Sequence, residues 1–238
     1  MDNYCIRPDY VAREANLSLD EGERKFWGEE RIRESALYQW HVYAFAANLV
    51  QERSIGAVLD VGCGTAAKLV EHLAPVTEIY GIDQPSAASF CRDRYKCPRF
   101  FADDFEAPQL DLKQDFRLII CSDVIEHVTN PDVLLNYIRR FCSPDSLVLL
   151  STPDRDRLRG RNSLRSPKAE HVREWNYAEF GDYVRSRGFE IVRHWHLPPV
   201  KTAANRLFAV HLLRQLTRLR PYNLNQAVLC RLTQARPS

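Results

Sequence analysis

The chain has 238 residues, of which 45% are hydrophobic, and carries a net charge of +2 at pH 7. This length and apolar content suffice for a sizeable core, and one large domain is a better interpretation than two small ones. Residues 1–5 lack the basic region and apolar run of a signal peptide, and no stretch approaches the ~20 apolar residues that span a bilayer. These features argue against a membrane-spanning protein and predict a cytoplasmic one.

The seven cysteines form no CxxC pair, and an odd number cannot all pair in disulfides within one chain. A reducing compartment without a disulfide framework fits this pattern best. The charge is uneven, because residues 198–238 contain seven Lys or Arg and no Asp or Glu. The first 197 residues therefore carry a net charge of about −5, so the basicity belongs to the C-terminal tail.

Residues 30–51 have apolar side chains at helical spacing, which predicts a helix that packs on a sheet edge or covers a pocket. From residue 57 onward, short runs rich in Val, Ile and Leu alternate with helical patterns, an order typical of a parallel sheet with helices on both faces. The predicted strands lie at 57–61, 78–82, 99–102, 117–122 and 146–151, and the predicted helices at 66–73, 87–95 and 133–141.

The later elements are signalled by caps and composition. Asn176 and Glu179 form a capping-box pattern that predicts a helix up to Arg187, followed by a strand at 189–197. Before them, residues 153–168 hold six Arg or Lys and little apolar content, which predicts a long loop at the carboxyl edge of the sheet. In the tail, periodicity leaves open a helix at 203–219 or a final strand at 207–213.

These elements predict an α/β fold with a doubly wound, mostly parallel, Rossmann-like sheet, helices on both faces and an N-terminal helical extension. The expected division is a helical extension at 1–54, a ligand-binding domain at 55–200, and a basic C-terminal segment at 201–238. We expect that last segment to pack on or beside the same domain.

The most specific motif follows the first predicted strand. Residues 62–67 read Gly-Cys-Gly-Thr-Ala-Ala, which satisfies the G-x-G-x-x-A pattern of dinucleotide-binding folds, with Asp83 downstream. Asp60 argues against a dinucleotide, because a carboxylate there would repel a pyrophosphate but suits a cationic sulfonium ligand with an ammonium group. Acidic residues also recur where successive strands end, which is where open α/β sheets bind ligands. They are Asp60, Asp83, Asp103 and Asp123.

Residues 58–65, Val-Leu-Asp-Val-Gly-Cys-Gly-Thr, resemble motif I of the class I S-adenosylmethionine-dependent methyltransferases. Matching motifs cover roughly residues 55–195. The resemblance implies that Gly62 and Gly64 let the backbone approach the methionine part of the cofactor, while Asp60 organises its ammonium end.

The same resemblance implies further cofactor contacts. Asp83 would accept both ribose hydroxyls, and Ser122 would complete the cofactor site. Asp103 would bind the adenine amine, with the neighbouring Asp104 as the alternative. The alternatives without a cofactor are that Asp83 caps the following helix and that the glycines only form a turn.

Residues 121–128, Cys-Ser-Asp-Val-Ile-Glu-His-Val, lack the Asn/Asp-Pro-Pro-Tyr-type motif common in nitrogen methylases, which favours oxygen as the acceptor. The run resembles the E-x-x-E-H segment of ubiquinone-pathway O-methyltransferases and of enzymes that methylate the terminal ribose 2'-hydroxyl of small RNAs. This resemblance implies a divalent metal, magnesium or manganese. Asp123 stands one methylene short of the family's Glu. The implied ligands are Asp123, Glu126, His127 and His171.

Residues 171–175, His-Val-Arg-Glu-Trp, resemble the block that carries the fourth ligand in the RNA group, and residues 151–154 resemble its S-T-P-N segment. The first block is also similar to methyltransferases of glycan and secondary-metabolite pathways. Without a metal, His127 or His171 would act as the catalytic general base. Alternatively, Glu126 and His127 only cap the loop after the fourth strand, and His171 lies on the surface.

The sequence leaves three functions open. The first is O-methylation of a polyhydroxylated small molecule, such as a sugar, glycan or glycosylated metabolite, whose vicinal diol could chelate the metal. The second is ribose 2'-O-methylation at RNA 3' ends, although the chain has no recognisable RNA-binding module. The third is a non-catalytic module that binds a cofactor or partner. The arginines at 155, 157, 159, 161 and 165 form either a solvated loop or a clamp for a phosphorylated acceptor.

Overall fold

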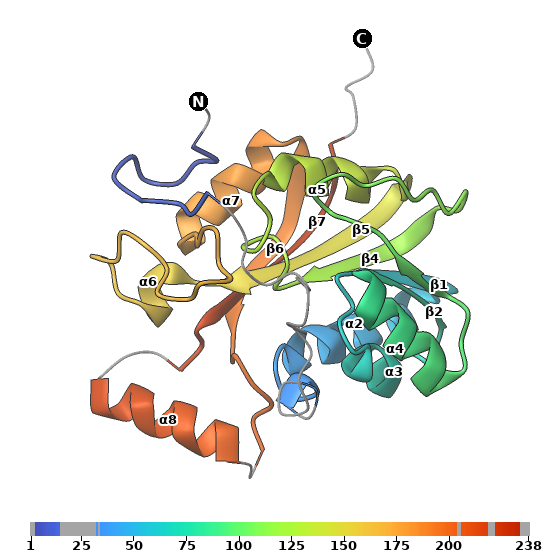
Figure 1. Cartoon of the computed structure of the whole chain (residues 1–238), viewed down its shortest axis with the longest axis horizontal. Coiled ribbons are helices and arrows are strands. Elements are labelled where there is room, and N and C mark those ends of the chain that lie inside the picture. The colour runs from blue at the N-terminus through green and yellow to red at the C-terminus, as the bar shows by residue number, and fades with distance from the viewer. Residues whose placement is uncertain (1–2, 15–31, 33, 204–205, 219–221, 234–238) are drawn as a thin grey trace.

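The computed structural model describes residues 3–14, 32, 34–203, 206–218 and 222–233. Its centre is a seven-stranded sheet in the order β3-β2-β1-β4-β5-β7-β6 (Figure 1). β7 runs antiparallel to both of its neighbours, and the other pairs are parallel. The strands are β1 (Ala57–Val61), β2 (Glu78–Asp83), β3 (Phe100–Ala102), β4 (Phe116–Ser122), β5 (Cys142–Pro153), β6 (Phe189–Leu197) and β7 (Asn225–Leu232).

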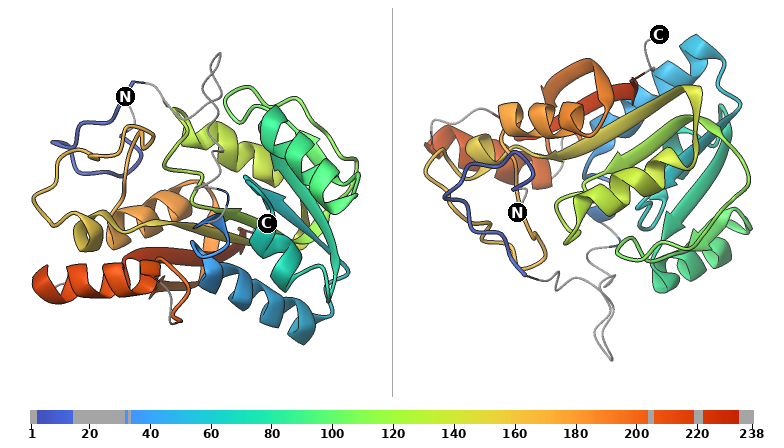
Figure 2. Two further views of the ribbon diagram at one scale, coloured as in Figure 1. Left: turned by 60° about the horizontal axis from the view of Figure 1, so that its bottom comes forward. Right: turned by 90° about the horizontal axis from the view of Figure 1, so that it is seen from above.

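Helices cover both faces of this sheet (Figures 1 and 2). They are α2 (Trp40–Arg53), α3 (Ala67–His72), α4 (Pro85–Tyr95), α5 (Pro131–Arg139), α6 (Arg155–Leu158), α7 (Tyr177–Ser186) and α8 (Arg206–Arg218). Successive strand residues point to opposite faces, so Val58 packs in a core beneath α2, α3 and α4, while Leu59 packs in a second core beneath α5 and α7. The predicted doubly wound α/β fold is confirmed.

The last strand was not predicted. β7 lies within the tail segment 201–238 and inserts between β5 and β6, where its first six residues are buried. In the same tail, α8 resolves the ambiguity between helix and strand in favour of a helix for residues 206–218, while residues 204, 205 and 219 lie outside the described part. No helix among the described residues is long and apolar enough to cross a membrane.

The expected N-terminal helix is interrupted, because residues 32, 34 and 35 are helical but residues 36–39 are not. Residues 30, 31 and 33 lie outside the described part, and Gln39 adopts a left-handed conformation with φ 53°, so α2 begins at Trp40. Just before it, Tyr38 forms an isolated antiparallel bridge with Val200. Residues 36–39 therefore interrupt the helical pattern between residue 35 and α2.

The prediction of a structureless loop at 153–168 is wrong in its first part. β5 continues to Pro153 and α6 follows, with the Asp154 side chain accepting a hydrogen bond from the Arg157 amide. Arg155 is only 1% exposed. Its guanidinium donates to both carboxylate oxygens of Glu179, at 2.7 and 3.0 Å, and Glu179 also closes the capping box of α7. This ion pair joins the segment after β5 to the helix that precedes β6.

We expect Arg155→Ala to lower the free energy of unfolding by about 3 kcal/mol, because it leaves the largely buried carboxylate of Glu179 without its charged partner. Arg165→Ala is the matched control: Arg165 is exposed, and its loss should change stability by no more than about 0.5 kcal/mol. Urea denaturation of both variants measures the difference. If the Arg155→Ala and Arg165→Ala variants were equally stable, the ion pair between Arg155 and Glu179 would contribute nothing to the stability of the fold.

Candidate active site

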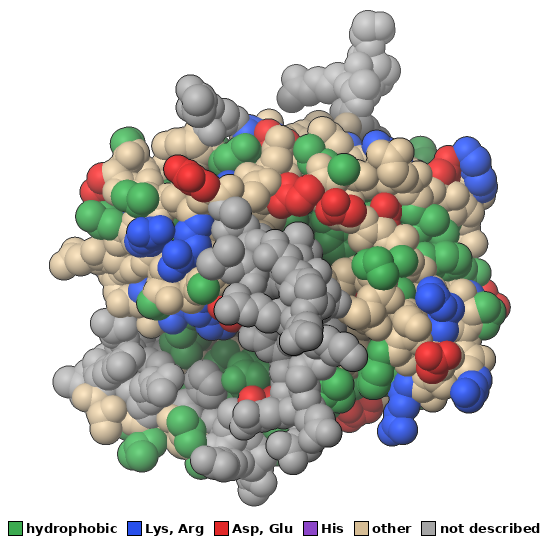
Figure 3. Space-filling model, in the orientation of Figure 1, with side chains coloured by type: hydrophobic (Ala, Val, Ile, Leu, Met, Phe, Trp, Pro, Cys, Tyr) green, Lys and Arg blue, Asp and Glu red, His purple; other side chains and the backbone are tan. Residues whose placement is uncertain are grey.

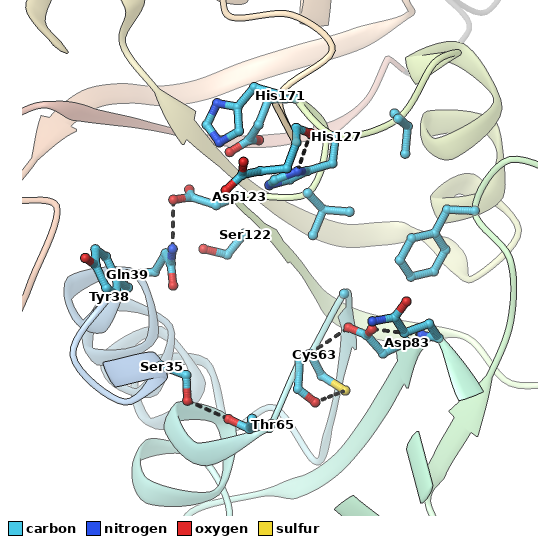
Figure 4. A pocket seen from close by; sticks show the side chains of 18 of the residues that line it. Ser35, Tyr38, Gln39, Cys63, Thr65, Asp83, Ser122, Asp123, His127 and His171 are labelled. Carbon is cyan, nitrogen blue, oxygen red and sulfur yellow. Dashed lines mark hydrogen bonds between the residues drawn. The ribbon is translucent and has the colours of Figure 1, made fainter. Parts of the chain in front are cut away.

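A cavity of about 1110 Å³ opens where the parallel strands end. Its wall is built from the turns after β1, β2, β3 and β4, together with residues 34–43 and 168–171 (Figure 4). The volume is at the upper end of the range typical of ligand sites, roughly 300–1,000 Å³. One cavity of this size has room for a nucleoside cofactor and a second, smaller molecule.

The glycine turn after β1 forms one wall of the cavity. Gly62 and Gly64 have φ of 87° and 55°, a left-handed conformation that glycine adopts without strain, and a Cβ at Gly62 would collide with Val124. Asp83 stabilises the turn, because its carboxylate accepts from the backbone amides of Gly64 at 2.7 Å and Gln84 at 2.8 Å. The structure thus brings three of the predicted cofactor residues, Gly62, Gly64 and Asp83, together on the cavity wall.

Asp103, Asp104 and Ser122 lie on the same wall, whereas Asp60 does not line the cavity. The Asp103 carboxylate accepts from the amides of Asp104, Gln109 and Leu110, at 2.9, 3.1 and 2.9 Å, so it holds the loop after β3 in place. Asp104 is exposed beside it. The Ser122 hydroxyl lies 2.7 Å from the hydroxyl of Ser151, at the ends of β4 and β5. Which of the two aspartates contacts the adenine stays a prediction.

Asp60 is fully buried just before the glycine turn. One carboxylate oxygen, Oδ2, accepts from the Tyr43 hydroxyl at 2.8 Å, and the other, Oδ1, has no hydrogen-bond partner among the described residues. Burial raises the pKa of Asp60 to about 7, although the Tyr43 hydrogen bond and the nearby charge of Lys68 act in the opposite direction. An unsatisfied carboxylate oxygen of this kind fits a cationic group of a ligand.

A second cluster on the cavity wall combines two residues that follow β4 with His171, which comes from the segment after α6. Glu126, His127 and His171 each offer one ligand atom, and these atoms lie within 4.8 Å of one another. Figure 4 shows the two imidazoles side by side. The alternative that His171 is a surface residue is wrong, since it is only 2% exposed. Two imidazoles and one carboxylate at this spacing could hold a divalent metal with positions left open for other oxygens.

Both imidazoles are oriented through their Nδ1 atoms. His127 Nδ1 lies 2.8 Å from the carbonyl oxygen of Glu170, and His171 Nδ1 lies 2.7 Å from Oε1 of Glu174. Since each partner is an acceptor, Nδ1 carries the proton and Nε2 keeps its lone pair. Burial lowers the pKa of His127 to about 3, so its ring is neutral at physiological pH. Metal-binding histidines are typically fixed in this way.

Glu174 is the buried residue that orients His171. Its carboxylate also accepts from Arg159 and from the Ser166 hydroxyl, at 2.9 and 2.8 Å. Burial alone would raise the pKa of Glu174, but the hydrogen bonds from His171 and Arg159 hold it well below its usual range. The carboxylate therefore stays ionised and favours a proton on Nδ1 of His171.

Asp123 lies on the cavity wall but outside this cluster. Its Oδ2 accepts from Gln39 at 2.9 Å (Figure 4) and from Asn225 at 2.9 Å, and its Oδ1 accepts from the Ser151 hydroxyl at 2.7 Å. The structure thus gathers three of the four implied ligands and leaves Asp123 bound to neighbouring side chains. Gln39 and Asn225 were not predicted as site residues.

The arginine clamp has no counterpart on the cavity wall. Arg155 and Arg159 bind Glu179 and Glu174, and Arg161 and Arg165 are exposed on the α6 side of the molecule, where Figure 3 shows basic side chains. None of the five arginines lines the cavity, whose described residues include eight carboxylates and two lysines. A wall of this charge disfavours an acceptor with a free phosphate.

The comparisons with known proteins bear on the whole site. Residues 30–194 match the family model described as Methyltransferase domain, which covers more than half of the chain. The chain belongs to this family. Family and fold together support S-adenosyl-L-methionine as the cofactor of this methyltransferase. A search of curated proteins found no match.

Solved structures share the fold of the methyltransferase at low sequence identity. An S-adenosylmethionine-dependent methyltransferase from Clostridium acetobutylicum is 12% identical, with a TM-score of 0.59 over 82% of this chain and 93% of the other. The mitomycin 7-O-methyltransferase MmcR is 14% identical, with a TM-score of 0.55 over 82% and 54%. The glycopeptide N-methyltransferase MtfA, complexed with S-adenosyl-L-methionine, is 15% identical, with a TM-score of 0.54 over 80% and 93%. Oxygen and nitrogen methylases thus share this architecture.

The buried carboxylate of Asp60 should make the stability of the cofactor-free methyltransferase depend on pH. Its folded pKa, about 7, lies above its ordinary value of 3.8, so the folded chain holds a proton that the unfolded chain releases. The stabilisation is complete below pH 3.8 and is lost as the pH rises to about 7. Relative to Asp60→Asn, the wild type should lose on the order of a few kcal/mol between pH 4 and pH 7.

Urea denaturation across this pH range, without ligand, measures the two profiles. Asp145→Asn removes an exposed carboxylate and serves as the control, which should parallel the wild type. If the Asp60→Asn profile also paralleled the wild type, Asp60 would be ionised throughout the range and the assignment of its pKa would be wrong.

Proposed function

We propose that this methyltransferase transfers the methyl group of S-adenosylmethionine to a hydroxyl of a polyhydroxylated small molecule, such as a sugar, a glycan or a glycosylated metabolite. A divalent metal, magnesium or manganese, assists the transfer. The observation that carries the proposal is the cluster of Glu126, His127 and His171, which faces the same cavity as the glycine turn.

The cluster fits a metal ion in its chemistry. The two Nε2 atoms keep lone pairs, and Glu126 is buried with its Oε2 accepting from the Thr152 hydroxyl at 3.0 Å. A bound dication would lower the pKa of an acceptor hydroxyl, as it does for metal-bound water. It would be held by Glu126, His127 and His171, and Asp123 would position the neighbouring wall rather than coordinate.

The residues of the chain arrange the two reactants for an in-line displacement. Asp60, Gly62, Gly64, Asp83 and the Asp103–Asp104 pair would hold the cofactor at the end of the cavity formed by β1, β2 and β3. The acceptor would lie against the cluster at the ends of β4 and β5. The oxygen–carbon bond forms as the sulfur–carbon bond breaks, and the acceptor hydroxyl releases its proton. The neutral Nε2 of His127 or His171 is the candidate base where no metal occupies the cluster.

The charge of the cavity wall limits which kinds of acceptor molecule can bind. Eight carboxylates and two lysines line it, and although burial raises the pKa of Glu126, the carboxylates still outnumber the positive charges of the lysines and a bound dication. An uncharged polyol meets this wall without repulsion, whereas a nucleic acid or a phosphorylated sugar brings further negative charge. The alternative of RNA 3'-end methylation therefore gains no support from the described wall, and a non-catalytic module would not need an oriented pair of imidazoles.

We propose the cytoplasm or another reducing compartment as the site of action. All seven cysteines are free thiols, and four of them, Cys63, Cys91, Cys121 and Cys230, are buried in the cores. A chain that uses its cysteines as small apolar residues does not depend on an oxidising environment.

Removal of the metal should abolish methyl transfer, and added manganese or magnesium should restore it. His171→Ala should lose metal binding and at least ~10²-fold in turnover while it retains affinity for S-adenosylhomocysteine. His194→Ala is the control, because this histidine of β6 stacks on Tyr177 and does not line the cavity. Transfer from labelled cofactor and manganese titration measure both properties. Full activity in a chelator-treated, metal-free preparation would contradict the metal site.

The acceptor itself is tested by transfer of a labelled methyl group into fractionated extract of the source cell. We expect the label in small, uncharged, polyhydroxylated molecules, in a form that resists ribonuclease and phosphatase treatment, because the wall is acidic. Label that ribonuclease releases would instead establish the RNA reaction. Tight cofactor binding with no transfer to any fraction would contradict catalysis.

A further inference from the structure

The helix α8 presents an apolar side to solvent that methyl transfer does not use. Val210, Leu213 and Leu216 recur every three residues, so they lie on one side of the helix. Their exposed fractions are 44%, 63% and 63%, and the last two are the highest among the large hydrophobic residues that the structure describes as exposed. Single exposed apolar residues are common on proteins, but three on one side of one helix form a shared apolar surface.

The other side of α8 faces the rest of the chain. Phe208 and Leu212 are half-buried there, and the ring of Phe208 packs edge-on against the ring of Tyr222, with the ring centres 5.5 Å apart. α8 belongs to the connection between β6 and β7, and Figure 1 shows it at the margin of the molecule, apart from the helices that cover the sheet. The fold therefore holds α8 by one side and leaves its apolar side open.

The charge of this part of the chain indicates the kind of partner. The sequence of α8 contains three arginines and no Asp or Glu, and residues 198–238 as a whole contain seven Lys or Arg and no acidic residue. The first 197 residues carry a net charge of about −5. A negatively charged partner therefore attracts the segment that carries α8 and repels the remainder of the chain, which turns α8 toward the partner.

We propose that α8 docks the methyltransferase on an anionic lipid surface, with Val210, Leu213 and Leu216 entering the boundary between headgroups and acyl chains. Helices that lie in this boundary combine an apolar side with basic residues. α8 has 13 residues and is about 20 Å long, shorter than the ~30 Å hydrocarbon core, so it lies on a bilayer and does not span it. This docking does not depend on the proposed reaction.

Two protein partners are the alternatives to a lipid surface. In a second copy of this chain, α8 would meet another α8 whose segment also contains arginines and no acidic residue, so the two copies would repel each other. An acidic protein would match the charge, but three apolar side chains are few beside the roughly 20–30 residues that each side of a stable protein interface contributes. A lipid surface needs no such matched area.

Co-sedimentation with vesicles tests the docking on the full chain. Vesicles of phosphatidylcholine with about 30 mol% phosphatidylglycerol should bind the protein, and vesicles of phosphatidylcholine alone should bind it at least about tenfold more weakly. Addition of about 0.5 M NaCl should weaken binding to the anionic vesicles by a similar factor, because salt screens the basic segment.

Leu213→Asp should weaken binding to the anionic vesicles by about tenfold or more, since it removes apolar area and adds a charge that the lipid surface repels. Val192→Asp is the matched control. Val192 is 48% exposed in β6, so this substitution makes the same change of charge at an exposed apolar residue outside α8. It should leave the affinity for the vesicles within about twofold.

Absence of binding to the anionic vesicles would overturn the proposal, as would equal binding to neutral vesicles or equal weakening by Leu213→Asp and Val192→Asp. A dimer that forms without vesicles and that Leu213→Asp dissociates in sedimentation velocity would assign the apolar side of α8 to a second copy and would also overturn it. Each of these outcomes leaves the proposed methyl transfer intact, because binding is measured without cofactor, metal or acceptor.

Discussion

The parallel pairing of β1 with both β2 and β4 is the constraint on which the site depends. Asp60 of β1 lies in register with Gly81 on one side and Ile120 on the other. Because the chain runs outward to β3 and then returns to β4, the turns that follow β1 and β4 diverge and leave a gap at the carboxyl edge. The glycine turn and residues 123–128 open into that gap from opposite sides. One cavity can therefore hold a cofactor against one turn and an acceptor against the other.

The acceptor side of the cavity depends on a second constraint, which is the burial of Glu174. Regular secondary structure does not position residues 166–174, so side chains must do so. The Glu174 carboxylate accepts hydrogen bonds from His171, Arg159 and Ser166, and the Glu174 amide donates to the hydroxyl of Tyr10 at 3.0 Å. The donors compensate for the loss of hydration at the buried carboxylate. Segments far apart in the chain thereby hold one imidazole with its free nitrogen toward the cavity.

The sequence predicts the parallel sheet, the glycine turn and the cluster around His127 well, since each depends on a local pattern. It does not predict β7 or its residue Asn225, because the insertion of a strand between β5 and β6 comes from long-range pairing. The apolar run at 227–230 is typical of a strand buried on both faces and was the available signal. Gln39 could not be recognised as a site residue, because the apolar side chains keep a helical spacing through the position where its backbone is left-handed. Arg155 reads as a loop residue because its partner, Glu179, comes much later in the chain.

The most direct test of the account is a crystal structure with S-adenosylhomocysteine and manganese, with data collected at the manganese absorption edge. The account predicts the nucleoside against the glycine turn and an anomalous peak between Glu126, His127 and His171, in the same cavity. An occupied cofactor site with no anomalous peak at those three residues, at saturating manganese, would contradict a metal-assisted methyl transfer.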